Sequence, residues 1–199
     1  MVALLRRPKE RQVDMGHSQA EKAATRERVL QIASRKIRSE DIARLGIADL
    51  MNEAGLTHGG FYKHFDSRDD LITQAAAAAL AEGTAKMERS AQENARDPQA
   101  GLIGAYLAKK HRDDPATGCA LVTLGAVAGR DDRHLKEAYE KQVRTYLDLI
   151  AGLDKDSEDA RAEAILTLSA LVGAVLMARA VADEAFSDEL LETVRARLT

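Results

Sequence analysis

Residues 55–65 read Gly-Leu-Thr-His-Gly-Gly-Phe-Tyr-Lys-His-Phe and follow a short stretch whose apolar residues recur at helical spacing. Gly55 predicts the end of that first helix, because glycine readily adopts the left-handed conformation that a helix end requires. Thr57 suits the cap of a second helix, on which Phe61 and Phe65 lie four residues apart and face inward. Two short helices joined by a three-residue turn are typical of a helix-turn-helix, whose second helix enters the major groove of DNA. The apolar residues of the first helix are Ile47, Leu50, Met51 and Ala54.

The side chains left outside this pair of helices suit contact with DNA. Gly59 and Gly60 lie in the first turn of the second helix, where a glycine costs about 1 kcal/mol relative to alanine. Close approach of the helix to a DNA backbone would offset that cost. His58 and Lys63 are long enough to reach base edges or phosphates, and the Tyr62 hydroxyl is a donor for a phosphate, a contact that positions without reading sequence.

Residues 55–71 closely resemble the DNA-binding segment of TetR-type repressors, where a Gly-x-Ser/Thr turn leads to Tyr-x-His-Phe and then to Ser-Lys/Arg and an acidic residue. The resemblance is strong from Ala20 to Leu71; beyond it, such repressors share architecture rather than residues. Asp41 and Leu45 depart from the pattern, since a glycine and a threonine usually stand there. The resemblance implies that Thr57, Tyr62 and His64 hold phosphates, that His58, Gly59 and Lys63 face bases, and that Arg68 touches the DNA backbone from the next helix.

The composition favours an all-helical chain with a basic and an acidic part. Three prolines and 4% aromatic residues among 199 residues are typical of helical proteins. The net charge of −3 alone argues against a nucleic-acid-binding protein. However, residues 1–68 carry 13 Lys and Arg against 9 Asp and Glu, whereas residues 69–199 carry 16 against 23. This distribution fits one module that faces DNA and one that avoids it.

We expect an all-α fold of about nine helices, with an N-terminal three-helix helix-turn-helix domain and a C-terminal helical ligand-binding and dimerisation domain. Residues 1–17 are expected to form a flexible basic arm, which either tracks phosphates or is a disordered extension before a start at Met15. Residues 18–66 form the DNA-binding domain, and Ser18 begins its first helix in a capping box. Residues 67–199 form the second domain, which Ser67 opens by capping a long linking helix. Further helices are expected from Pro98 to about His111 and from Ser187 to Leu198.

A long apolar helix near the C-terminus predicts a homodimer. Its middle, residues 165–177, is apolar nearly all round, so every side must be covered, and a second copy most readily covers the last side. The uncharged stretch is 15 residues long, which is shorter than the roughly 20 that a membrane span needs. Burial within one subunit is the alternative. The predicted interface comprises Leu166, Ser169, Ala170, Gly173, Ala174, Met177, Leu191 and Val194.

No catalytic or metal-binding pattern stands out, so we expect no enzyme activity, no metal and no cofactor. The five histidines do not pair at the helical spacing of metal ligands, and neither a phosphate-binding loop nor a Gly-x-Ser-x-Gly motif is found. The single cysteine, Cys119, excludes an intrachain disulfide and suits a reducing cytoplasm. We expect Cys119 to be a packing residue; the alternative is an oxidant or electrophile sensor, because it follows Gly118 at a helix start.

The resemblance implies a small-molecule pocket among the middle helices, since the repressors in question are released by ligands bound there. The expected function is therefore a homodimeric, cytoplasmic repressor that a small-molecule inducer releases from a near-palindromic DNA operator. One alternative is a repressor that senses redox state or electrophiles through Cys119. The other is a helical protein-interaction module that does not bind DNA, which the basic N-terminal part disfavours. The candidate pocket residues are Tyr106, Cys119, Val122, Thr123, Tyr139, Val143, Tyr146 and Met177.

Overall fold

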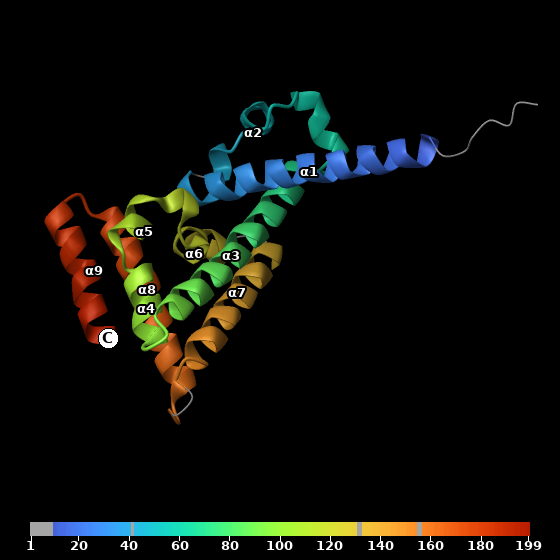
Figure 1. Cartoon of the computed structure of the whole chain (residues 1–199). Helices are drawn as coiled ribbons and strands as arrows, with labels where there is room; N and C mark the ends of the chain where they lie inside the picture. Colours follow the sequence, from blue (N-terminus) through green and yellow to red (C-terminus); the bar gives the residue numbers. More distant parts are fainter. Residues whose placement is uncertain (1–9, 41, 131–132, 155–156) are drawn as a thin grey trace, which may run out of the picture.

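The computed structural model describes residues 10–40, 42–130, 133–154 and 157–199, and all regular structure in these ranges is helical (Figure 1). The predicted all-α fold with about nine helices is confirmed. Three short 3-10 segments accompany the α-helices: η1 (Ile42–Arg44), η2 (His58–Lys63) and η3 (Pro115–Thr117). The α-helices are α1 (Glu10–Ser39), α2 (Ile47–Glu53), α3 (Arg68–Glu93), α4 (Pro98–Tyr106), α5 (Lys109–Asp113), α6 (Ala120–Arg130), α7 (Arg133–Ala151), α8 (Ala160–Ala180) and α9 (Glu184–Leu198).

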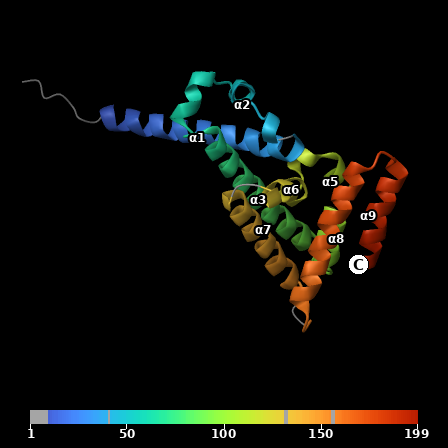
Figure 2. The same cartoon turned by 180° about the vertical axis from the view of Figure 1, so that it is seen from behind.

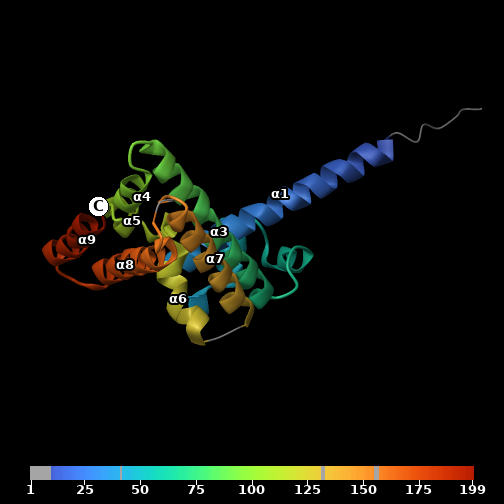
Figure 3. The same ribbon diagram turned by 90° about the horizontal axis from the view of Figure 1, so that it is seen from below.

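The helices form a head and a body that meet along α1. In this description the head is α1, η1, α2 and η2, and the body is α3 to α9. Figures 1 and 2 show α2 and η2 on one side of α1 and the body on the other, with α3 descending from α1 beside α7. Helices α8, α9 and α4 form the opposite side of the body, and α6 lies between the two sides. Figure 3, viewed from below, shows that the N-terminal part of α1 projects beyond the body.

The core of the head follows from the spacing of its apolar residues. Gly55 has a φ of +72° and ends α2. The amide of Gly55 donates to the carbonyl of Asn52 at 3.0 Å, and that of Leu56 donates to the carbonyl of Met51 at 2.8 Å, which is a Schellman motif. Beyond the turn, Phe61 and Phe65 are almost fully buried, as expected.

Helix α3 links the head to the body. The Ser67 hydroxyl accepts a hydrogen bond from the Asp70 amide at 3.0 Å, so the predicted cap is confirmed. Small residues such as Ala75 and Ala79 are buried and let α1 approach closely. At this contact the Ser34 hydroxyl on α1 donates to the carbonyl of Ala75 at 2.8 Å. Helix α3 is thus tied to the head by a buried contact and a hydrogen bond with α1.

Two expectations for the head are wrong. Helix α1 begins at Glu10 rather than at Ser18, so the predicted capping box lies inside the helix; residues 1–9 of the expected arm lie outside the described residues. Thr57 makes no side-chain capping bond, and residues 58–63 form a 3-10 helix rather than an α-helix. Two consecutive glycines and a length of six residues explain this, because glycine weakens helices and 3-10 turns suit short pieces.

Two expected helices of the body also differ. Helix α4 ends at Tyr106 rather than near His111, because Ala108 is extended (φ −71°, ψ 143°) and starts the separate helix α5. The last helix begins at Glu184, capped by the Asp183 carboxylate, which accepts from the Phe186 amide at 3.0 Å. Ser187 is not a cap. It lies buried and donates to a carbonyl oxygen of α8 at 2.7 Å.

Candidate nucleic-acid interface and ligand cleft

The segment after Gly55 presents a polar surface on the side of the head away from its core. Phe61 and Phe65 anchor the segment from beneath, with ring centroids 5.5 Å apart. Tyr62 points outward and is 69% exposed, although its ring contacts Phe61 edge to face. Five of the predicted DNA-contact residues are exposed and three are half-buried. The exposed ones are Thr57, His58, Gly59, Tyr62 and Lys63, and the half-buried ones are Gly60, His64 and Arg68.

The two glycines of this surface are not required by packing inside the protein. A Cβ atom at Gly59 would meet nothing within 4 Å. At Gly60 it would make ordinary contacts, 3.6 Å from Met51 Cε and 3.8 Å from Thr57 Oγ1. Neither glycine has a positive φ. The free protein therefore has room for a side chain at Gly59, and packing inside the protein gives no reason for a glycine there.

Arg68 holds the head together, a role the sequence did not indicate. Its guanidinium donates to the carbonyl of Leu45 at 3.2 Å and to that of Ile42 at 2.5 Å. Leu45 itself is 4% exposed, so its side chain belongs to the core. Arg68 thus fixes the backbone that precedes α2, and it is committed to the protein rather than pointing freely at a DNA backbone.

Arg26 on α1 supports the far end of the recognition segment and was missed in the sequence. Its Nε donates to the carbonyl of His64 at 3.4 Å, another guanidinium nitrogen donates to Gln74, and the group lies 5.2 Å from the centre of the Phe65 ring. Arg26 precedes the inward-facing Val29 by three residues, and this spacing would have placed it on the buried face. Burial lowers the pKa of His64, and nearby Lys22, Arg26 and Lys63 lower it further.

A cleft of about 540 Å³ opens in the body between α3, α4, α5, η3 and α7. Of the eight candidate pocket residues, Tyr106, Cys119 and Tyr146 line it. Its walls also include residues that sequence reasoning missed, among them Lys86 and His111. These come from α3 and α5, which no local pattern in the sequence brings together.

The other five candidate pocket residues lie elsewhere. The hydroxyl of Thr123 donates to the carbonyl of Arg38 at 3.0 Å, and that of Tyr139 to the carbonyl of Leu121 at 3.3 Å. Met177 faces outward from α8 and is 48% exposed. They do not line this cleft, because helical spacing does not distinguish the wall of a cleft from other contacts between helices. The five residues outside the cleft lining are Val122, Thr123, Tyr139, Val143 and Met177.

His111 connects the inner wall of the cleft to the start of α6. Its Nδ1 lies 2.6 Å from the carbonyl of Tyr106, and its Nε2 accepts from the amide of Cys119 at 2.8 Å. These partners define the neutral ring with the proton on Nδ1. Burial lowers the pKa of His111, and the charges of Arg179 and Lys86 act in the same direction. The ring therefore joins α4 to the segment that leads into α6 while it stays neutral.

Cys119 and the two tyrosines form the inner end of the cleft. The Cys119 thiol is 3.9 Å from the Tyr146 hydroxyl, and the residue is 6% exposed. The Tyr106 hydroxyl is buried and has no hydrogen-bond partner in the described part of the chain. Burial, followed by the nearby Cys119, raises the pKa of both tyrosines. A Cβ at Gly83 would lie 1.8 Å from the Tyr146 oxygen, so only glycine leaves room for that hydroxyl.

A partly apolar surface covers the outer side of α8. Four of its large side chains are at least 46% exposed, and the adjoining α9 contributes Phe186 at 47%. Of the predicted interface residues, Ala174 and Leu191 are each 1% exposed and face the core of the subunit itself, because α8 and α9 pack on each other there. Leu166, Ser169, Ala170, Gly173, Met177 and Val194 remain accessible to varying degrees. The exposed large residues of α8 are Ile165, Leu166, Leu176 and Met177.

The length and composition of α8 alone would also suit a membrane span. It is the one such helix within the described residues, and 33% of its most apolar window is buried inside the subunit. A single helix of this kind is weak evidence for a membrane, because core helices of soluble proteins share these properties. An exposed apolar side of this kind is unfavourable in water and marks a surface where another molecule could bind.

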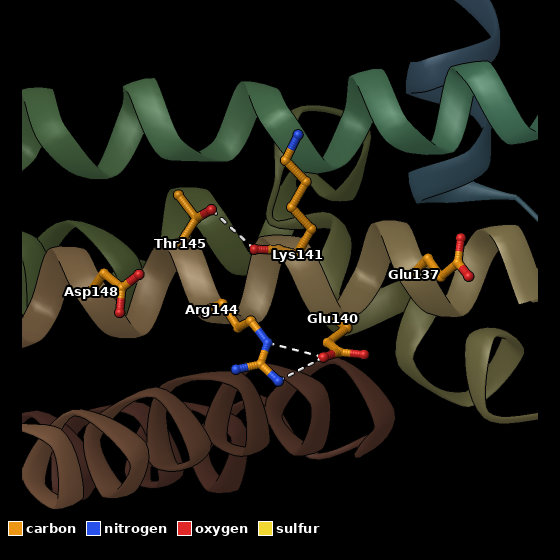
Figure 4. Close-up of a pocket in the computed structure, with 6 residues that line it drawn as sticks. All are labelled: Glu137, Glu140, Lys141, Arg144, Thr145 and Asp148. Atoms are coloured by element: carbon orange, nitrogen blue, oxygen red, sulfur yellow. Dashed lines mark hydrogen bonds and ion pairs between the residues drawn. The ribbon is translucent and has the colours of Figure 1, made fainter.

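A second, shallower depression of about 380 Å³ lies on the exposed face of α7 (Figure 4). Most of its charged groups are paired: Arg144 donates to Glu140 at 2.9 and 2.7 Å, Arg133 donates to Glu137 at 2.8 Å, and Arg161 donates to Asp148 at 2.7 Å. All six lining residues belong to one helix, so the depression is an ordinary solvated helix face. They are Glu137, Glu140, Lys141, Arg144, Thr145 and Asp148.

Comparison with known proteins finds a family match for the N-terminal segment. Residues 29–75, which include the helix-turn-helix, match the family model "Bacterial regulatory proteins, tetR family". No curated protein matches the chain. The reduced form of NemR from E. coli is similar in structure, with a TM-score of 0.74, 21% identity, and coverage of 87% of this chain and 95% of that one.

Two further solved structures resemble the whole chain. A TetR-family regulator from Cytophaga hutchinsonii has a TM-score of 0.75 and 17% identity, and covers 89% of this chain and 94% of its own. A TetR regulator from Chloroflexus aurantiacus has a TM-score of 0.74 and 22% identity, with 90% and 94% covered. At these identities the similarity shows a common fold, and the match to the tetR family model covers the N-terminal segment alone.

Proposed function

Because residues 29–75 match the tetR family model and the fold resembles solved TetR-family regulators, we propose that the chain is a TetR-family regulator, a homodimeric repressor that a small molecule releases from its operator. Regulation of transcription through DNA binding follows from the family. Members act as dimers, respond to small molecules and are in general not enzymes. The repressing role, the near-palindromic operator and the inducer are our proposal. We also propose a cytoplasmic location, residues 18–66 as the DNA-binding unit and residues 67–199 as the ligand-binding and dimerisation unit.

The exposed polar surface of η2 carries the DNA-binding part of the proposal. Tyr62 and Lys63 project from a segment that Phe61 and Phe65 hold rigidly against the head, so a duplex meets a preorganised surface. We assign phosphate contacts to Thr57, Tyr62 and His64 and base contacts to His58, Gly59 and Lys63. Gly60 lets the segment approach the duplex. Arg68 acts by holding the backbone before α2 rather than by reaching the DNA, in view of its bonds to Ile42 and Leu45.

The exposed apolar side of α8 supports the proposed dimer. A contiguous apolar surface of this kind is unfavourable in water and is typical of an interface. A two-fold axis through α8 and α9 brings the same residues of both subunits together and presents two heads to two half-sites. We place Leu166, Ser169, Gly173 and Met177 at the centre of this interface, and Val194 at its edge on α9.

The test uses the whole protein and double-stranded DNA from upstream of its own gene, followed by fluorescence anisotropy. We expect binding of one dimer per site and a steep loss of affinity with salt, by a slope of about −0.9 for each phosphate contact. A protein that binds no DNA at low salt would contradict the proposal and favour a helical protein-interaction module.

A second candidate function is a repressor that senses oxidants or electrophiles through Cys119. Two observations favour it: Cys119, although buried in the core, also lines the cleft, and one structural relative is described as a reduced form. The small exposed fraction of Cys119, 6%, argues against rapid reaction. We therefore keep the small-molecule inducer as the first candidate.

A further inference from the structure

The mouth of the cleft is basic. Lys86, Arg89 and Lys110 line it, against a single carboxylate, Glu93. None of these four side chains forms an ion pair with another residue in the described ranges, although many charged groups elsewhere on the surface do. The cleft thus gathers an excess of positive charge in an acidic body. An anion is the species that such a site attracts.

Lys86 is the cation set deepest in this wall. It is half-buried, and its ammonium donates to the neutral carbonyl of Thr117. Glu82 and Asp114 lie near enough to favour its charge, but neither forms an ion pair with it in the described part of the chain. Burial lowers the pKa of Lys86, which indicates that its charge has lost part of its hydration. A carboxylate placed beside this ammonium would form a charge-assisted hydrogen bond, which would replace the hydration that burial removed.

The inner part of the cleft is apolar and has one unsatisfied donor. Met87, Leu102 and the rings of Tyr106 and Tyr146 form its walls. The Tyr106 hydroxyl lacks a partner there, and Cys119 beside it is a poor acceptor. Buried hydroxyls in proteins are normally satisfied, so this one points to a ligand oxygen. The volume of about 540 Å³ lies within the range of small-molecule sites.

We propose that the cleft binds an amphipathic carboxylic acid, with its carboxylate beside Lys86 and its apolar body against Met87 and Leu102. An oxygen of the acid accepts the hydrogen bond of the Tyr106 hydroxyl. A neutral apolar ligand would leave the Lys86 ammonium desolvated and unpaired, and a cationic ligand would face three positive side chains. This inference rests on the proposed function in one respect, which is that the cleft is taken as the binding site of the small-molecule inducer.

The test is calorimetric titration of the full chain, without DNA, with three probes of equal length: decanoate below its micelle concentration, decan-1-ol and decylamine. We expect decanoate to bind at least tenfold more tightly than either of the other two, since a charge-assisted hydrogen bond is worth about that factor. Equal or tighter binding of the alcohol or the amine would overturn the proposal. So would failure of every straight-chain acid from hexanoate to tetradecanoate and of 2-naphthoate to bind.

Three variants locate the carboxylate. Lys86→Gln should weaken decanoate binding at least tenfold and leave decan-1-ol unaffected, whereas Lys86→Arg should restore it. Lys141→Gln, at an exposed lysine on α7 outside the cleft, is the matched control and should change nothing. Full decanoate affinity in a folded Lys86→Gln protein would refute the assignment.

The Tyr106→Phe variant tests whether the Tyr106 hydroxyl donates a hydrogen bond to the ligand or only stabilises the fold. The hydroxyl has no partner to lose, so the urea midpoint of the free protein should stay the same or rise while decanoate binds more weakly. A fall in the midpoint with unchanged binding would count against the proposal. Release of operator DNA by decanoate is measured separately: binding without release would contradict the inducer role but leave the ligand class standing.

Discussion

The guanidinium of Arg38, near the end of α1, donates to the backbone oxygen of Ala116 in η3 at 3.0 Å. The same side chain donates to the carbonyl of Ala79 on α3 at 3.1 Å and pairs with Glu82. In the other direction, Thr123 on α6 donates to the carbonyl of Arg38 at 3.0 Å. Thr117, the neighbour of Ala116, accepts from Lys86 in the cleft wall. The end of the head helix is thus bonded to the segment that borders the cleft.

Replacement of Arg38 should uncouple the head from the cleft. Arg38→Leu removes the donors of two carbonyls, and its side chain is only 2% exposed, so we expect a loss of roughly 1–3 kcal/mol in unfolding free energy. DNA affinity should be retained at low temperature, whereas release by inducer should be reduced. Urea denaturation and anisotropy measure the two effects. Arg35→Leu, at an exposed position of the same helix, is the control; an equal loss there would contradict a special role for Arg38.

Two neighbouring side chains of η2 should affect DNA binding differently. Tyr62→Phe removes a phosphate donor, so affinity should fall by about 1 kcal/mol on every sequence alike. Lys63→Ala should change the preference among operator variants, because base contacts carry the sequence information. Anisotropy titrations against the operator and a scrambled duplex measure both. Tyr139→Phe in the body is the control, and a sequence-dependent loss in Tyr62→Phe would show that Tyr62 reads bases.

An arginine on the outer side of α8 should separate the subunits. A Cβ at Gly173 would meet nothing within 4 Å, so the isolated subunit accommodates Gly173→Arg. In the dimer, the charge would be buried without a partner, at a cost of several kcal/mol. Light scattering should show a monomer and operator binding should collapse. Gly129→Arg, at another helical glycine with open space around it, should stay dimeric. A dimer of unchanged stability in Gly173→Arg would rule out this interface.

The stability of the protein should fall in mild acid because of His111. Its folded-state pKa is lowered, chiefly by burial, so the folded protein binds fewer protons than the unfolded chain. The contribution of neutral His111 to the free energy of unfolding is therefore complete above the ordinary histidine pKa of 6.5. It is lost as the pH falls below that value. Protonated Nε2 would also oppose the Cys119 amide. Urea midpoints measured between pH 5 and 8 should change less in His111→Gln than in the native protein.

His64 should make an independent contribution to this pH dependence, because burial lowers its pKa as well. His64→Gln should remove a separate part of the acid sensitivity, and the double variant should remove both parts. An unchanged midpoint profile in His111→Gln would mean that its bonds to Tyr106 and Cys119 do not control stability.

Cys119 should react slowly with an alkylating agent in the native protein and rapidly in denaturant. Its small exposed fraction restricts access to the thiol. Cys119→Ser should cost about 1 kcal/mol in stability and leave inducer release unchanged. Mass spectrometry after timed alkylation measures the rate. Fast alkylation of the native dimer with loss of DNA binding would instead support the redox-sensing function.

The helix-turn-helix could be predicted because its determinants are local. Gly55 ends α2 through bonds that span four to six residues, and the spacing of Phe61 and Phe65 alone places both in the core. The Ser67 cap of α3 and the proline start of α4 at Pro98 are of the same kind. Interactions between residues three to five apart recur at helical spacing, so they leave a pattern in the sequence.

Only the tertiary structure decided which side chains meet in the cleft and which sides of the helices stay exposed. Lys86, Tyr106 and His111 come together because α3 packs on α4 and the short helix α5 follows α4 directly, and Arg38 reaches Ala116 across 78 positions of the chain. Ser187 suited a cap by its type, yet α8 lies close enough to bury it. Contacts between residues so far apart in the chain depend on how whole helices pack against each other. Such packing leaves no periodic pattern in the sequence. For the same reason, the apolar sequence of α8 indicated that it must be covered, while the fold decided which of its sides the subunit leaves exposed.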